Sequence, residues 1–357
     1  MNPLENTEVV RLLANGAIGI TYLINYKGSG GVDTPAILKI RKLFDDEVRA
    51  KNSVMYVIQE FDKFASKYPD HFMSLKEIKM ISNCTWDYYS EIKLNNIKQP
   101  KRERPENKSK TCLAAIYTPV LSGTLKSWYS DFIFPNYKQS AKYIYSFLSQ
   151  LFYIFYLMDR NNWYHTDLNT GNMMYKSVSE NYEVLANING KIYKIPTFGY
   201  LWYVIDYDTL YTPAISVKEG YSINRIKRSK HFYILRTIDR ILYQPYNNSN
   251  TKFPKSEAVA EKILKNKSCH FIRSLLPNIQ EPDTVWYIVI ILCVLFRPNI
   301  YMDLLNIKNE ENEVFVEMMK KNQFFDKNLF IFIANNLNHE DKIIEKLLQF
   351  IETENAK

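Results

Sequence analysis

The residues best suited to chemistry lie in one stretch, residues 164–172, which reads YHTDLNTGN. It holds a carboxylate, Asp167, and an amide five positions later, Asn172, and a second carboxylate, Asp206, follows an apolar segment. One carboxylate can accept the proton of an incoming hydroxyl. An amide oxygen and a second carboxylate can hold Mg²⁺ against phosphates, because Mg²⁺ prefers hard oxygen ligands. The pattern therefore predicts a site for a metal-bound phosphate.

The fixed letters from His165 to Asn172 match the catalytic loop of protein kinases, His-x-Asp-Leu-x-x-x-Asn. Asp206-Tyr207-Asp208 stands where those enzymes carry Asp-Phe-Gly. The chain thus resembles the protein-kinase superfamily, and most of all the divergent serine/threonine-type kinases of large DNA viruses. The resemblance implies an ATP- and Mg²⁺-dependent phosphotransferase. Asp167 would be its catalytic base, Asn172 and Asp206 would hold the metal, and His165 would brace the loop.

A glycine-containing segment near the N-terminus resembles the G-x-G-x-x-G loop that covers ATP phosphates in this superfamily. Gly16 and Gly19 fall at its second and third glycines, Ala14 at the first and Thr21 at the following valine. Glycines suit such a loop because backbone N–H groups can then approach phosphate oxygens closely. A plain hairpin turn is the alternative interpretation of the two glycines.

Lys39 ends the apolar run of residues 36–38 and resembles the lysine of the third kinase strand. The resemblance assigns it to the ATP phosphates and to a glutamate on a helix. Glu60 is the expected glutamate, because residues 53–65 have helical spacing, and Glu47 is the competing candidate. The alternative for Lys39 is the solvated face of an edge strand.

The elements that must position these residues change character along the chain. Strand patterns come first, at residues 9–26, 34–40, 72–82 and 113–120, and helical patterns follow at 143–160, 232–243, 285–296, 312–320 and 341–351. The resemblance implies an α+β, bilobal, protein-kinase-like fold. Residues 1–119 would form a small N-lobe with an antiparallel sheet and one helix, and residues 120–357 a larger, mainly helical C-lobe. Residues 116–125 resemble the hinge, which would bring Tyr117 near the adenine pocket.

The interval between the catalytic loop and Asp206 is long, since Asp206 follows Asn172 by 34 positions. Asn189-Gly190, between two alternating segments, predicts an inserted hairpin with a type I′ turn. Residues 200–205 should form the strand that leads to Asp206. Asp208 replaces the glycine of Asp-Phe-Gly, either as an extra carboxylate facing the metal or, the favoured reading, as a cap of the following turn.

Composition bounds the possible functions. Apolar residues make up 46% of the 357 residues and charged residues 24%, which is typical of a globular chain. Basic runs at residues 98–110 and 218–230 account for the whole net charge of +8, so we expect no nucleic-acid-binding face spread over the fold. Either run could be a solvated loop, but the second, lying beside the site, would favour an acidic protein substrate.

Two further features concern the environment of the chain. The longest apolar run, residues 284–296, has 13 residues, whereas a bilayer needs about 20, so we expect no membrane span. The four cysteines lack metal-binding spacing and indicate reduced thiols, hence a cytoplasmic protein, in the host cytoplasm or the virion if the chain is viral.

Three functions are compatible with these residues. The first is a protein kinase, most simply of the serine/threonine class; the second is a small-molecule kinase of the aminoglycoside or choline type; the third is a pseudokinase scaffold. Gly16 and Gly19 favour the first over the second. The presence of Lys39, together with both proposed metal ligands and Asp167, favours an active enzyme. Asn169 stands where serine/threonine kinases carry lysine, which leaves the acceptor open.

Overall fold

A computed structural model describes residues 7–15, 19–28, 31–43, 53–82, 111–133, 135–136, 140–165, 167–213, 234–238, 256–277, 282–304 and 325–355. The chain divides into two units, the first comprising Met1–Leu121 with Ile205–Ser222 and the second Ser122–Val204 with Ile223–Lys357. The first boundary falls two residues after the one proposed from the sequence. The segment that carries Asp206 belongs to the first unit, whereas the sequence analysis assigned it to the second lobe.

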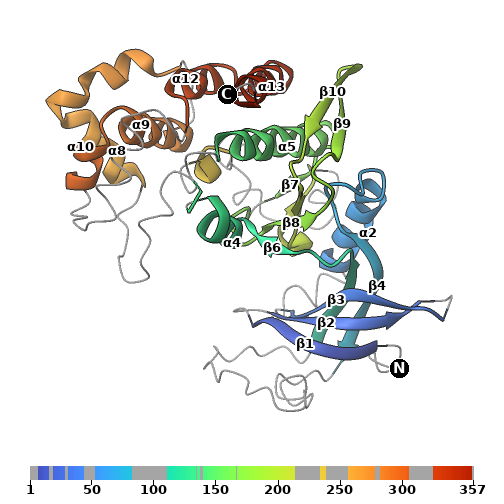
Figure 1. The fold of residues 1–357 in the computed structure, drawn as a ribbon. Helices are drawn as coiled ribbons and strands as arrows, with labels where there is room; N and C mark the ends of the chain where they lie inside the picture. The colour runs from blue at the N-terminus through green and yellow to red at the C-terminus, as the bar shows by residue number, and fades with distance from the viewer. Residues whose placement is uncertain are drawn as a thin grey trace. The chain divides into compact units, whose positions relative to one another are not determined.

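The first unit is built on a five-stranded antiparallel sheet in the order β1-β2-β3-β5-β4 (Figure 1). Its strands are β1 (Thr7–Asn15), β2 (Gly19–Lys27), β3 (Asp33–Lys42), β4 (Ser74–Ser82) and β5 (Thr111–Thr118). The strands predicted from the alternating pattern are therefore confirmed. The sheet carries one described helix, α2 (Ser53–Ala65), with the bounds expected from its apolar spacing.

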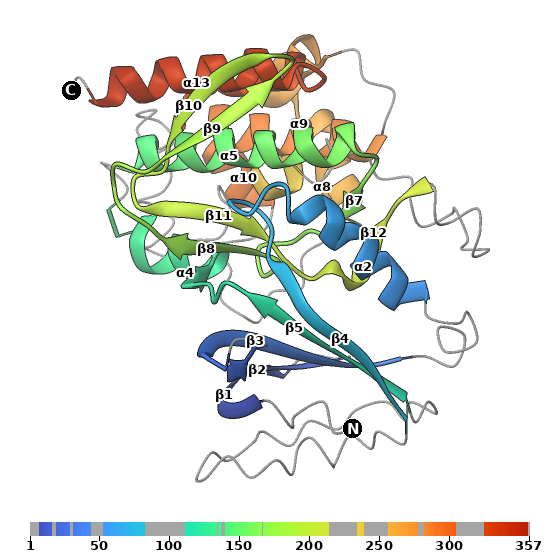
Figure 2. The same cartoon turned by 90° about the vertical axis from the view of Figure 1, so that its right-hand side faces the viewer.

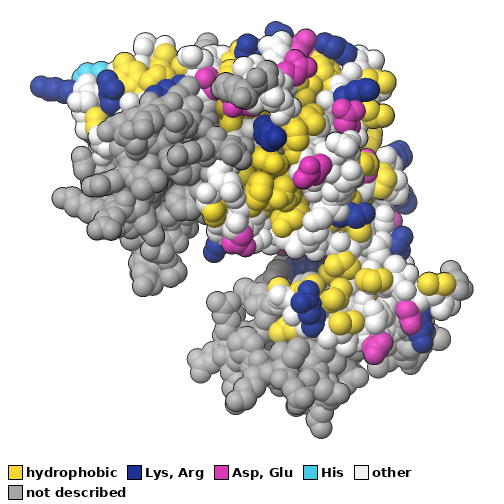
Figure 3. Space-filling view, viewed as in Figure 1, with side chains coloured by type: hydrophobic (Ala, Val, Ile, Leu, Met, Phe, Trp, Pro, Cys, Tyr) yellow, Lys and Arg dark blue, Asp and Glu magenta, His cyan; other side chains and the backbone are white. Residues whose placement is uncertain are grey.

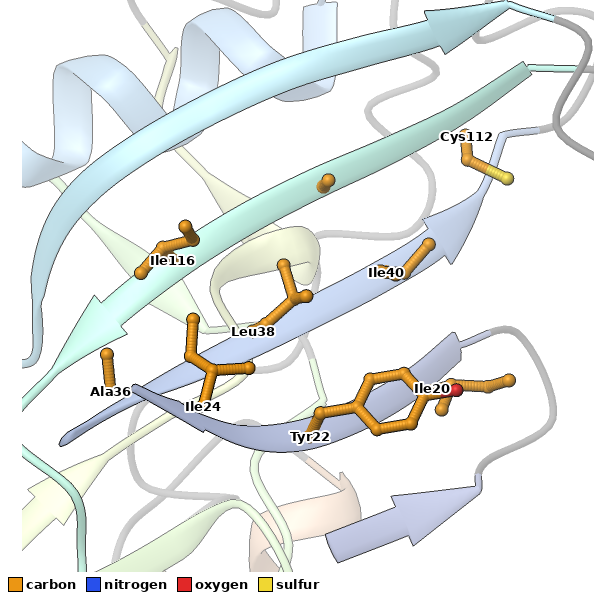
Figure 4. Close-up of a cluster of buried hydrophobic side chains, with 9 residues drawn as sticks. Ile20, Tyr22, Ile24, Ala36, Leu38, Ile40, Cys112 and Ile116 are labelled. Carbon is orange, nitrogen blue, oxygen red and sulfur yellow. The ribbon is translucent and has the colours of Figure 1, made fainter. Parts of the chain in front are cut away.

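The two faces of this sheet differ in chemistry. Apolar side chains of β2, β3 and β5 form one buried cluster, made of Ile20, Tyr22, Ile24, Ala36, Leu38, Ile40, Cys112, Ala114 and Ile116 (Figure 4). Successive side chains of a strand point to opposite faces. Lys39, which lies between Leu38 and Ile40, therefore projects from the face opposite the cluster.

Helix α2 packs through an aromatic side. Phe61 is 1% exposed, and its ring centroid lies 5.3 Å from that of Phe64 and 5.5 Å from that of Phe72. The carboxylate of Asp62 accepts a hydrogen bond of 2.8 Å from the backbone N–H of Leu75, at the start of β4. The helix is thus attached both to the residues before β4 and to the strand itself.

The second unit is organised around α5 (Ala141–Arg160), which is buried along most of its length. Its side chains are apolar nearly all round, as a central helix requires. A three-stranded sheet in the order β11-β8-β6 joins β11 (Tyr200–Val204), β8 (Met173–Ser177) and β6 (Gly123–Thr124). Gln150 of α5 donates to the carbonyl of Tyr200 and accepts from the N–H of Trp202, at 3.1 and 3.0 Å, and so ties the helix to β11.

The inserted hairpin is confirmed. Strands β9 (Glu183–Ile188) and β10 (Lys191–Pro196) pair across a two-residue turn, with Ile188 opposite Lys191. Asn189 and Gly190 have φ values of 53° and 85°, as a type I′ turn requires. The hairpin packs against α5 and, through β10, against α13 (Figure 2).

The remaining helices lie mostly towards the C-terminus. They are α4 (Leu125–Trp128), the π-helix η1 (Tyr129–Ile133), α8 (Ser256–Lys265), the 3₁₀ helix η6 (Lys267–Leu275), α9 (Pro282–Phe296), α10 (Pro298–Leu304), α12 (Lys327–Asn335) and α13 (Glu340–Asn355). The helices predicted at 285–296 and 341–351 are confirmed. Residues 234–238 are helical within the predicted 232–243, and the helix predicted at 312–320 lies outside the described residues.

Four observations bear on the expected environment and charge of the chain. Within the residues that the structure describes, no helix combines the length and apolar character needed to cross a bilayer. Cys269 and Cys293 are buried free thiols, but Cys112 is disulfide-bonded, which corrects the expectation that all the cysteines are reduced. In the view of Figure 3, acidic and basic side chains of the described residues are interspersed rather than segregated. The basic runs 98–110 and 218–230 lie outside the described residues.

Candidate functional site

Lys39 of β3 lies between two carboxylates in the first unit. Its Nζ is 2.5 Å from Oδ1 of Asp206 and 2.7 Å from Oδ2 of Asp208. Arg41, two residues along the same strand, places its Nε 3.8 Å from that oxygen of Asp208. Burial tends to lower the pKa of Lys39, but the charges of Asp208 and Asp206 outweigh it and raise this pKa above its usual value. Lys39 is therefore a cation at neutral pH.

A short 3₁₀ turn, η3 (Tyr207–Thr209), presents the two carboxylates. The Tyr207 hydroxyl accepts a 2.7 Å hydrogen bond from the N–H of Met73, and its ring centroid is 4.6 Å from that of Phe61 in α2. Asp206, just before the turn, has left-handed φ and ψ angles of 70° and 62°. Aspartate tolerates this region better than most residues, and such conformations concentrate at functional sites.

The expected pair between Lys39 and Glu60 is not formed. Glu60 accepts a 2.5 Å hydrogen bond from Lys63 on its own helix, while the described carboxylate partners of Lys39 are Asp206 and Asp208. The physical reason is the orientation of α2, whose core-facing side is occupied by aromatic residues such as Phe61. Glu47, the competing candidate, lies outside the described residues.

Asp208 also differs from its favoured interpretation. Among the described residues, no hydrogen bond from its carboxylate to the following turn occurs; the side chain is 4% exposed and faces Lys39 and Arg41. Arg41 was missed by the sequence analysis. Its position two residues after Lys39 could have revealed it, because such residues share a face of a strand.

The residues proposed to contact ATP form part of one row across the sheet. Thr21 lies directly opposite Lys39 in the pairing of β2 with β3, and Ala14 lies opposite Thr21 in β1. On the other side of Lys39 the row continues to Ala115 of β5. Tyr117, two residues further along β5, shares this face and is 6% exposed.

Of the two glycines in the proposed phosphate loop, the structure describes Gly19. Gly19 has a packing reason to be glycine, because a Cβ there would lie 3.1 Å from the carbonyl oxygen of Ile40. Gly16 lies outside the described residues. A role of either glycine in phosphate binding stays a prediction.

The stretch 165–172, in the second unit, is closed by its own hydrogen bonds. The carbonyl oxygen of Asp167 accepts from the side-chain amides of Asn172, at 2.8 Å, and Asn169, at 3.1 Å. The Asn169 side chain in turn accepts from the N–H of Gly171 at 2.8 Å. His165 is 3% exposed, and its Nδ1 accepts from the N–H of Asp167 at 3.3 Å.

These hydrogen bonds use the backbone N–H and carbonyl groups of Asp167 but not its carboxylate. The Asp167 side chain is exposed, and no hydrogen bond to its carboxylate occurs among the described residues. Asn172 uses its amide nitrogen, so its oxygen remains available as a ligand. The loop can therefore offer one carboxylate as a base and one amide oxygen to a metal.

Each unit holds one of the two hard oxygen donors proposed from the sequence for Mg²⁺. Asn172 supplies an amide oxygen in the second unit and Asp206 a carboxylate in the first. Mg²⁺ commonly takes one or two protein ligands and completes its shell with water and phosphate oxygens. Among the described residues, no cluster of three or more His, Cys, Asp or Glu side chains that could hold a metal ion occurs.

Comparison with known proteins gives a similarity in structure but none in sequence family. No protein-family model matches the chain, and no curated protein matches it. Among solved structures, a BubR1 kinase domain is similar, with 11% sequence identity and a TM-score of 0.43 over 97% of this chain and 86% of that one.

Proposed function

We propose that the protein is an ATP- and Mg²⁺-dependent phosphotransferase, a protein serine/threonine kinase that transfers the ATP γ-phosphoryl group to a hydroxyl. The contact between Lys39 and Asp206 carries this proposal. Separate sequence motifs predict the two residues, Lys39 for phosphate binding and Asp206 for the metal. They lie 167 positions apart in the chain, yet their charged atoms are 2.5 Å apart.

The chemistry assigns a task to each group. Asp167 would accept the proton of the acceptor hydroxyl while the oxygen of that hydroxyl bonds to the γ-phosphorus. The bond between the γ-phosphorus and the β–γ bridging oxygen then breaks, and ADP leaves. Lys39 would neutralise phosphate charge. Bound Mg²⁺ would supply further neutralisation, with Asn172 and Asp206 as its protein ligands.

The row formed by Ala14, Thr21 and Lys39 supports ATP as the phosphoryl donor. Ala14 and Thr21 line the sheet face beside Lys39, and the small side chain of Ala115 continues that row. Tyr117 stands on the same face, where the hinge-like sequence would bring the adenine. The acceptor class rests on the sequence resemblance, and a small-molecule alcohol is the competing acceptor.

Transfer of labelled phosphate from ATP with Mg²⁺ tests the proposal. Acceptors are an acidic protein and a panel of small alcohols, and the variants are Asp167→Asn and the matched control Glu183→Gln. Glu183 begins β9 on the inserted hairpin, and its carboxylate lies 3.9 Å from Lys194.

We expect Glu183→Gln to label protein serine or threonine as the wild type does, and Asp167→Asn to lower the rate by about 10²–10⁴-fold, the usual range for loss of a general base. Transfer only to small alcohols would replace the protein-kinase assignment with a small-molecule kinase. ATP binding without transfer to any acceptor would favour a pseudokinase scaffold.

A further inference from the structure

We propose that Asp208 positions Lys39 for phosphate binding, a task that the resemblance gives to a glutamate on a helix. The inference rests on the proposed function and extends it to a residue that the superfamily motif does not contain. Asp208 stands at the glycine of Asp-Phe-Gly, so this chain would hold its phosphate-binding lysine from the metal-binding segment.

The two carboxylates beside Lys39 differ in exposure. The Asp208 side chain is 4% exposed and lies 2.7 Å from Nζ, whereas the Asp206 side chain is 28% exposed. A buried carboxylate is suited to a fixed structural ion pair, and a more exposed one can exchange partners. We therefore assign Asp208 to the lysine and leave Asp206 for the metal.

Arg41 makes the position of Asp208 more specific. Its Nε lies 3.8 Å from the same oxygen that contacts Lys39, and its side chain is 7% exposed. Lys39 and Arg41 project from one face of β3, so Asp208 bridges two cations on one strand. Removing the carboxylate would take away the negative charge that lies between these two neighbouring cations, which is costly in a poorly solvated place.

The turn that carries Asp208 is itself fixed. Tyr207 is 4% exposed, its hydroxyl accepts from the N–H of Met73, and its ring meets Tyr117 edge-on with centroids 5.7 Å apart. The neighbouring residue thus anchors the turn against β5 and the residues before β4. This anchoring limits where the Asp208 side chain can lie, as a positioning residue requires.

The charges around Lys39 and the contact made by Glu60 are both consistent with this assignment. Burial lowers the pKa of Lys39, and the charges of Asp208 and Asp206 and their hydrogen bonds to Nζ raise it. Glu60, the residue expected from the sequence, instead pairs with Lys63 on the surface of α2.

The first test measures unfolding and needs no enzymatic activity. A double-mutant cycle measured by urea unfolding gives the coupling between the two side chains, from Lys39→Met, Asp208→Asn and the variant with both changes. The matched cycle measures the coupling of Lys39 with Glu60, from Lys39→Met, Glu60→Gln and their double variant. We expect the Lys39–Asp208 coupling to change the unfolding equilibrium constant by about tenfold and the Lys39–Glu60 coupling by less than about twofold. The reverse order would overturn the proposal.

The second test asks whether the pair serves nucleotide binding. Affinity for a fluorescent ATP analogue and, where transfer occurs, kcat and KM for ATP are measured for the same variants with Asp208→Glu added. We expect Asp208→Asn and Lys39→Met to weaken binding by similar factors, the double variant to lose little more, and Asp208→Glu to recover part of the loss. A loss in Asp208→Asn that raised Mg²⁺ reverses would instead identify Asp208 as a metal ligand and overturn the proposal.

The analogue separates this inference from the proposed function. If the wild type binds the analogue but transfers no phosphate, the proposed activity fails, while shared binding losses in the Lys39 and Asp208 variants still support the positioning role. If Asp208→Asn unfolds, the comparison proceeds with Asp208→Glu. Unchanged analogue affinity in a folded Asp208 variant contradicts the role.

Discussion

Asn172 donates its side-chain amide to the carbonyl oxygen of Asp167, at 2.8 Å, and so joins the proposed metal ligand to the backbone of the proposed base. The bond spans five residues and uses only the amide nitrogen of Asn172, so it does not occupy the side-chain oxygen. One side chain thereby closes the loop and keeps a ligand atom available. Replacing Asn172 should therefore affect both the loop and the metal requirement.

We expect Asn172→Ala to reduce the free energy of unfolding by about 1 kcal/mol, the usual net value of one hydrogen bond. Because the substitution also removes the proposed ligand oxygen, phosphate transfer should need a higher Mg²⁺ concentration. Urea unfolding and a Mg²⁺ titration of transfer measure the two effects separately. An unchanged Mg²⁺ requirement would remove Asn172 from the metal site.

Tyr207→Phe should destabilise the first unit without creating a cavity. The hydroxyl is the acceptor for the buried N–H of Met73, and its loss should cost about 1–3 kcal/mol through the unsatisfied donor. Tyr207→Ala, which also removes the ring packed on Phe61, should cost more, about 3–5 kcal/mol by analogy with other aromatic truncations. Equal costs for the two variants would contradict the importance of the ring contact.

Gly190→Ala tests the turn of the inserted hairpin. Its φ of 85° is unfavourable for any residue with a Cβ, so we expect a loss of about 1–2 kcal/mol. Asn189→Gly is the comparison and should cost less, about 0.5–1 kcal/mol, because glycine adopts the φ of 53° readily and only the exposed hydrogen bonds from Tyr156 and Arg160 to the side chain are lost. Thermal unfolding measures both, and an Asn189→Gly loss as large as that of Gly190→Ala would argue against this turn geometry.

Gln150→Leu tests the attachment of α5 to β11. Gln150 is fully buried, donates to the carbonyl of Tyr200 and accepts from the N–H of Trp202. Leucine fills similar space but leaves both backbone groups without this partner, at an expected cost of about 2–4 kcal/mol. Ser149→Ala, which loses only a hydroxyl that donates within the helix, should cost less. A neutral Gln150→Leu variant would show that the polar link contributes little to stability.

Local pattern alone was sufficient to predict many elements. The bounds of α2, the strands of the first sheet and the Asn189-Gly190 hairpin follow from apolar period and turn chemistry, which act over a few neighbouring residues. The hydrogen bonds that close the loop around Asp167 also have a local origin, because their donors and acceptors lie within five residues of one another. For the same reason the candidate residues of that loop could be identified from their spacing.

The partners of Lys39 depended on tertiary structure. Local spacing could show that Glu60 is on a helix, but not that the helix turns its aromatic side inwards while Glu60 pairs with Lys63. Asp206 and Asp208 reach Lys39 only because Tyr207 docks the intervening turn on α2, across more than 140 positions of chain between Phe61 and Tyr207. Which carboxylates neutralise the half-buried Lys39 is decided by packing between distant segments, and no local pattern encodes that choice.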